Sequence, residues 1–152
     1  AAVAEAAAGV ADRFDAQGVG NIVWASGVLG FRSEALIQSM VERAKSLTAQ
    51  LTASEISSAA LGVHLLNLPK LLRKFLECVI VPFGKFGAPS DGPAWVDLAN
   101  IACSAVRTSG EFAGSAEFAA RFRQLVLDPL QNGLAKVAHD HTLAASAALA
   151  SL

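Results

Sequence analysis

Apolar residues recur every three or four positions along almost the whole chain, whereas strict alternation of apolar and polar residues is hard to find. The first pattern is typical of an α-helix with one buried face, and alternation is typical of a β-strand. The segment from Glu34 to Leu47 shows the helical pattern clearly, because Ser33 precedes it as an N-cap candidate and charged residues occupy its outer side. We therefore expect an all-α protein.

Breaks in this pattern predict where the helices begin and end. Gly30 ends the second helix, and Pro69 suits the first turn of the fifth. The segment from Pro82 to Pro93 is rich in Pro and Gly and predicts a long loop. The expected helices are 1–13, 17–29, 34–47, 53–67, 70–80, 94–108, 116–127 with a weak continuation to 138 past Pro129, and 143–152.

The most informative feature is an internal repeat, seen when the chain is shifted against itself by 37 residues. The shift superposes apolar residues in both helices of a pair, for example Phe14 on Leu51, Val19 on Ile56, Leu29 on Leu66 and, in the preceding helix, Ala7 on Ala44. A third copy repeats Asn21-Ile22 at Asn100-Ile101, and a degenerate fourth copy begins at Thr142. One period therefore holds two helices.

Units of this length cannot bury their apolar faces alone, so we expect an α-solenoid of stacked antiparallel helix pairs. The chain then forms one helical-repeat domain, 1–152, with pairs at 14–50, 51–93 and 94–141 and partial repeats at 1–13 and 142–152. The alternative is an irregular helical bundle, because amphipathic helices in an Ala-rich chain partly align by chance. The residues expected to let neighbouring helices approach closely are Ala25, Gly27, Ala59, Ala60, Gly62, Ala102 and Ala105.

The composition excludes several classes of protein. With 53% hydrophobic and 16% charged residues the chain is not a disordered tail, and a net charge of -1 excludes a strongly basic nucleic-acid binder. The mean hydropathy of +0.45 is high, but no uncharged apolar run approaches the ~20 residues of a spanning helix, so we expect no membrane insertion. Because the chain begins with Ala1, we expect a processed or partial product.

The run from Phe14 to Gly30, FDAQGVGNIVWASGVLG, resembles the first helix of the heptatricopeptide and octotricopeptide repeats, the organellar helical repeats of RAP-type proteins. The run LANI at 98–101 is a second, weaker instance. The second copy carries Ser58, Leu61 and Asn67 where the first has Asn21, Trp24 and Gly30. The resemblance implies a protein that acts on mitochondrial or plastid RNA, including as a component of a divergent organellar ribosome.

Local groups of cations suit contact with RNA phosphates, which requires positive charge but no sequence readout. Lys70, Arg73 and Lys74 fall on one helix face, and Lys85 follows across the loop. A second group, Arg107, Arg121 and Arg123, is expected beside the first if the third helix pair stacks on the second. The alternative is a merely solvated charged face.

Several uncharged residues invite a specific role. Trp24 is expected to pack in the core rather than to stack on a base, because it lies among apolar neighbours. Asn21 and Asn100 recur inside apolar helices and need hydrogen-bond partners, either the backbone of a neighbouring turn or RNA. Cys78 and Cys103 lie in apolar runs and are expected to be reduced core residues.

The loop from Pro82 to Pro93 carries Phe83 and Phe86 on either side of Lys85. Long loops in compact arrays are uncommon unless they bind something, so we expect this loop to project and to bind a partner through both phenylalanines. The alternative is a loop that packs them against its own helices.

No catalytic or metal-binding pattern is evident. The imidazoles of His139 and His141 diverge on a helix, His64 is isolated, and no nucleophile has an evident base. We expect no enzyme, no cofactor and no small-molecule substrate. The first hypothesis is a structural subunit of a mitochondrial ribosome that contacts rRNA backbone and neighbouring proteins. The alternatives are a plastid location and a protein-interaction scaffold without RNA contact.

Overall fold

The computed structural model describes residues 2–80, 92–106 and 116–132, which form helices and turns without a β-strand. The helices are α1 (Ala2–Gly9), α2 (Ala16–Val28), α3 (Glu34–Ser46), α4 (Ala53–Leu65), α5 (Pro69–Ile80), α6 (Gly92–Val106) and α7 (Ala116–Phe122). A 3-10 turn, η1 (Ala11–Arg13), follows α1, and a π-helical turn, η3 (Arg123–Leu127), follows α7. The prediction of an all-α protein is confirmed.

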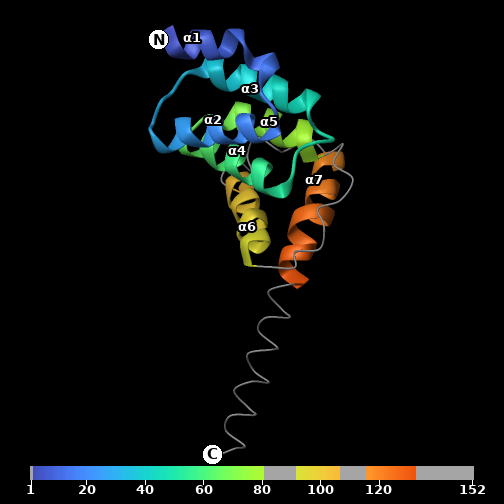
Figure 1. Cartoon of the computed structure of the whole chain (residues 1–152). Helices are drawn as coiled ribbons and strands as arrows, with labels where there is room; N and C mark the ends of the chain where they lie inside the picture. Colours follow the sequence, from blue (N-terminus) through green and yellow to red (C-terminus); the bar gives the residue numbers. More distant parts are fainter. Residues whose placement is uncertain (1, 81–91, 107–115, 133–152) are drawn as a thin grey trace, which may run out of the picture.

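Helices that are separated by one helix in the sequence are neighbours in space (Figure 1). Helix α4 packs between α2 and α6, and we call these three the first row. Helix α3 packs between α1 and α5, which form the second row, and α7 contacts α5. The core lies between the rows, where Ile37 and Met40 of α3 and Ile56 and Val63 of α4 are fully buried.

The same hydrogen bond begins both α2 and α4, helices of 13 residues each. The carboxylate of Asp15 accepts from the Gly18 N–H (2.7 Å), and the hydroxyl of Thr52 accepts from the Glu55 N–H (3.5 Å). Both are N-caps that satisfy an amide of the first turn. The start of α4 is therefore the start of α2 shifted by 37 residues.

The ends of α2 and α4 are also equivalent. Gly30 and Asn67 follow these helices with positive φ angles of 64° and 53°. In each copy two backbone bonds close a Schellman motif: Gly30 donates to Gly27 and Phe31 to Ser26, as Asn67 donates to His64 and Leu68 to Val63. Asn tolerates the left-handed region better than other non-Gly residues, so Asn67 retains the motif. The predicted repeat is present in the backbone hydrogen bonds.

Two glycines bring the backbones of α2 and α4 into contact. A Cβ atom added to Gly27 would lie 2.6 Å from Gly62 Cα, and one added to Gly62 would lie 2.8 Å from Trp24 Cα. Both distances are shorter than carbon atoms tolerate, so neither site accepts a side chain without a backbone shift. The predicted close approach is confirmed here, and of the other small residues Ala25 alone is not buried.

Pro93 lies in a helix where a loop was predicted, whereas the helix continues past Pro129 as predicted. Pro93 lies in the first turn of α6, which begins at Gly92, so the expected loop ends earlier than predicted. Pro129 is accommodated in a helix that runs on from η3 to residue 132. Proline cannot supply an interior helical N–H, and the wider π-helical turn directly before it relieves the crowding. The partial repeat 142–152 and most of the predicted loop lie outside the described residues.

We predict that Gly62→Ala lowers the free energy of unfolding by at least about 1 kcal/mol, because overpacking outweighs the gain in helix propensity. Denaturant titration measures this. Gly9→Ala is the matched control, since nothing lies within 4 Å of its new Cβ, and stability should be unchanged or rise by up to about 1 kcal/mol. Equal stability of wild type and Gly62→Ala would show that α2 and α4 separate at no cost.

Candidate functional site

The predicted basic patch on α5 is interleaved with carboxylates. Lys74 Nζ lies 2.5 Å from Glu42 Oε1 of α3, and Arg73 Nε donates to Glu77 Oε1 at 3.1 Å. Lys70 is exposed one turn before Lys74. Glu77 lies on the same helix as the cations, whereas the sequence gives no sign of Glu42, which reaches α5 only because α3 packs against it.

A shallow groove of about 280 Å³ separates α3 from α5 at these ion pairs, and Lys45 of α3 also lines it. We call the exposed or half-buried charges on α3 and α5 that line this groove or lie beside it the α3–α5 charged face: the cations Lys45, Lys70, Arg73 and Lys74 and the carboxylates Glu42 and Glu77. Four cations against two carboxylates leave it positive on balance. The potential is weaker than three unpaired cations on α5 would produce.

The pKa values of two groups beside this groove are shifted. Lys74 donates a hydrogen bond to Glu42 and attracts its charge, which lowers the pKa of the Glu42 carboxyl from its ordinary value of 4.5. Burial, with a smaller effect from Glu42, raises the pKa of the Cys78 thiol to about 11. Cys78 is therefore a protonated, weakly nucleophilic thiol at neutral pH. It packs half-buried against the core rather than within it.

The second predicted group of cations is only partly described. Arg121 of α7 donates to Gln124 Oε1 at 2.9 Å, and Arg123 is exposed on η3. Because α7 contacts α5, these residues belong to a helix beside the one that carries Lys70, Arg73 and Lys74. Lys85, Arg107, Phe83 and Phe86 lie outside the described residues, and the predicted roles of the loop stay predictions.

Trp24 is 45% exposed, so its predicted place in the core is wrong. Val19 and Val23 occupy the buried side of α2, and the contact of Gly27 with Gly62 leaves no space for an indole between the helices. Exposed or half-buried uncharged residues lie on each of the three first-row helices, α2, α4 and α6. We call them the outer face: Trp24, Val28, Leu61, Leu65, Val96 and Cys103.

The outer face is hollowed between α4 and α6 by a cavity of about 440 Å³, which Leu61, Leu65 and Cys103 line together with the half-buried, titratable His64. Asn100 also lines it and donates from Nδ2 to the Ser57 hydroxyl at 3.3 Å, so its described partner is a side chain of α4 rather than a backbone turn. Cys103 is exposed, which corrects its predicted place in the core. Asn21 is exposed as well.

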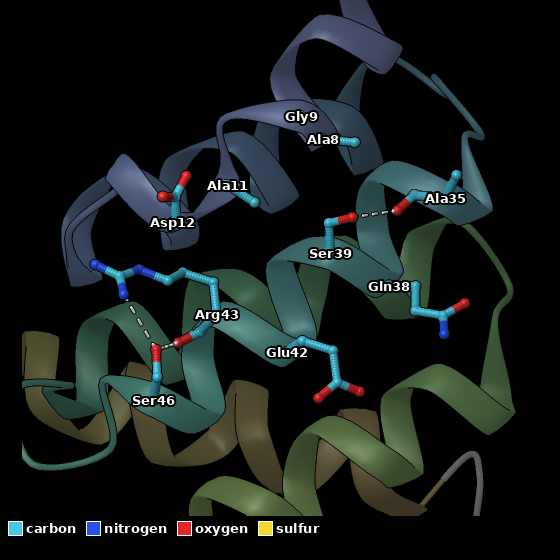
Figure 2. A pocket seen from close by; sticks show the side chains of 10 residues that line it. All are labelled: Ala8, Gly9, Ala11, Asp12, Ala35, Gln38, Ser39, Glu42, Arg43 and Ser46. Atoms are coloured by element: carbon cyan, nitrogen blue, oxygen red, sulfur yellow. Dashed lines mark hydrogen bonds between the residues drawn. The ribbon is translucent and has the colours of Figure 1, made fainter.

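A larger hollow of about 740 Å³ lies between α3 and the segment formed by α1 and η1. Figure 2 shows small side chains such as Ala8, Ala35 and Ser39 along it, with Asp12 and Arg43 at one end. Arg43 Nε donates to the Phe14 carbonyl at 2.8 Å, so the arginine anchors the chain before α2. The residues that line the hollow are small, polar or charged, and they include no His or Cys.

Among residues 2–80, 92–106 and 116–132, no three His, Cys, Asp or Glu side chains gather in a way that could hold a metal ion. Within the same ranges no helix has the length and apolar character needed to cross a membrane. His139 and His141 lie outside these ranges.

Comparison of the chain with protein-family models, with curated proteins and with solved structures finds no significant match. The described surface offers two candidate sites of interaction: the α3–α5 charged face, where cations and carboxylates are interleaved with an excess of cations, and the outer face on the first row.

We predict that Lys74→Met raises the pKa of Glu42 toward 4.5, which carboxyl NMR titration measures. A carboxyl with a lowered folded-state pKa stabilises the fold above its unfolded-state pKa and loses this effect as the pH falls through the folded-state value. Wild type should therefore lose more stability than Lys74→Met between pH 5 and about pH 3. Lys70→Met should leave the Glu42 titration unchanged, and a shift there would contradict the assigned pairing.

Proposed function

We propose that the chain is a short α-solenoid and a non-catalytic interaction subunit of an organellar assembly. Three observations support the solenoid: equivalent caps on α2 and α4, packing between alternate helices, and the glycine contact that spaces the first row. Such an array exposes long faces relative to its size, and those faces are what it offers to partners.

The proposed binding surface for a neighbouring protein is the outer face. It carries a partly exposed Trp24 together with Val28, Leu65 and Val96, and its side chains are uncharged. Contiguous exposed apolar side chains are uncommon on monomers and mark interaction sites, where aromatic residues are enriched. The partner is accordingly a protein with an uncharged, apolar contact surface. The resemblance of the α2 sequence to organellar repeats favours a mitochondrial ribosome as the assembly, with a plastid as the alternative location.

A second candidate function is contact with RNA backbone along the α3–α5 charged face. The observation that favours it is the excess of cations, because exposed Lys45 and Lys70 add to the two paired cations. Neutralisation of phosphates by a few lysines and arginines gives sequence-independent affinity. Such a protein would touch RNA with its second row and protein with its first.

We predict that the double variant Trp24→Ser, Leu65→Ser folds normally but separates from large particles. Both side chains are about half exposed, so their loss costs the isolated fold little. Sucrose-gradient sedimentation of a tagged chain in organelle extracts measures the particle-bound fraction. Glu34→Gln, an exposed change away from the outer face, is the control and should sediment as wild type. Wild-type chain found only in the free fraction would contradict a place in a large assembly.

For RNA, we predict that Lys45→Gln, Lys70→Gln flattens the plot of log affinity against log salt by about 1 to 2, because each lost phosphate contact removes about 0.7 to 0.9 from the slope. Titration of structured RNA at several salt concentrations gives the slope. Arg32→Gln removes an exposed cation elsewhere and should leave the slope unchanged. Absence of salt-dependent binding by wild type would exclude this second function.

A further inference from the structure

Equivalent positions of the repeat differ sharply in burial at one end of the array. Leu29 is 79% exposed, whereas Leu66, one repeat later, is 5% exposed. Phe31 is 42% exposed, whereas Leu68 is 6% exposed. The backbone geometry is the same in both copies, so local structure does not explain the difference. The second copy is covered by the first, and no described helix covers the first in the same way.

The side of α2 concerned follows from helical spacing. Gly18, Ile22, Ala25 and Leu29 form one stripe of α2, and we call it the docking side. Their equivalents on α4 are Glu55, Ala59, Gly62 and Leu66. Glu55 and Gly62 lie directly against the backbone of α2, and Ala59 and Leu66 are buried. A first-row helix therefore uses this stripe to pack on the helix before it.

The third copy buries the same stripe, although α6 runs steeply across α4 whereas α2 and α4 lie side by side (Figure 1). Ile101 and Ser104 of α6, the equivalents of Ile22 and Ala25, are buried, and Asn100 beside them bonds to Ser57 of α4. In α2, by contrast, Ile22 and Ala25 are only half-buried. The stripe is thus covered in two copies and partly open in one, although its residues remain small or aliphatic in the open copy.

The second row also shows lower burial at the same end of the array. Helix α1 packs on α3 as α3 packs on α5. Yet Ala7 and Val10 are half-buried, whereas their repeat equivalents Ala44 and Leu47 are buried. Each described second-row helix from α3 onward has a first-row helix from its own pair, and α1 has none among the described residues.

We propose that the docking side of α2, together with Phe31, binds one α-helix of a partner protein and so extends the first row. Helices α4 and α6 each bury this stripe where they pack in the first row, and the docking side of α2 offers the same stripe once more. Ala25 stands where Gly62 permits close approach, so the bound helix carries a small residue at the crossing. It presents no charge to the stripe, since burial of an unpaired charge is costly.

This inference deepens the proposed function and rests on it for the existence of a protein partner. The probe is a capped synthetic peptide with the sequence of residues 14–31, because α2 itself displays the required surface to α4 through Gly20, Val23 and Gly27. Added to the isotope-labelled full chain, it should bind saturably and shift the NMR signals of Ile22, Ala25 and Leu29.

Ala25→Glu should raise the Kd of the peptide at least tenfold. Leu29→Asp is a second variant of the docking side, and because the Leu29 side chain is largely exposed its loss costs the isolated fold little. Val28→Glu, with the same added charge on the outer face, should bind within twofold of wild type. Circular dichroism and thermal unfolding check that all three variants fold. Trp24→Ser, Leu65→Ser should also bind the peptide normally, which separates this test from that of the outer face.

Absence of binding, or equal weakening by Val28→Glu, would overturn the proposal. So would NMR shifts confined to α4, because they indicate that the peptide replaces α2 in its own array. A concentration-dependent dimer that Ala25→Glu dissociates, measured by analytical ultracentrifugation, would assign the surface to a second copy of this chain and overturn the choice of a partner protein.

Discussion

The contact between Gly27 and Gly62 sets the spacing on which the remaining architecture depends. Without Cβ atoms at this crossing, the backbones of α2 and α4 touch, and the helices are held closer than side chains would permit. The side chains of Val19 and Val23, on the same helix, are buried in the core. The same closeness expels the indole of Trp24 to the surface. One steric constraint thus shapes both the core and the outer face.

The second row is joined by different chemistry. Lys74 and Glu42 link α5 to α3 across a shallow groove, and both side chains are about half exposed. Exposed ion pairs contribute little to stability, so the apolar contacts beneath them hold the helices together. The pair matters more for the surface potential, because a cation that already faces a carboxylate attracts a phosphate less strongly. The α3–α5 charged face therefore attracts RNA phosphates less strongly than the same cations would without their carboxylate partners.

The helices, the repeat and the close contact could be predicted because each depends on local pattern: apolar spacing, capping residues and glycines in register. What could not be predicted depends on which helix lies opposite. Trp24 and Cys103 sit in apolar runs that look like core, yet their side of the helix faces solvent. Glu42 carries no local sign that it reaches Lys74. The exposure of Leu29 is likewise invisible in a sequence whose second copy buries the matching leucine.

The π-helical turn η3 changes the direction in which side chains point along the last described helical segment, residues 116–132. An additional residue in one turn rotates everything after it by about 100° relative to an uninterrupted α-helix. This segment contacts α5 of the second row through α7 and α6 of the first row through η3. A straight α-helix with a single apolar stripe would face one of them only. The π-helical turn thus rotates the apolar side of one continuous helical segment, so that the segment packs against both rows.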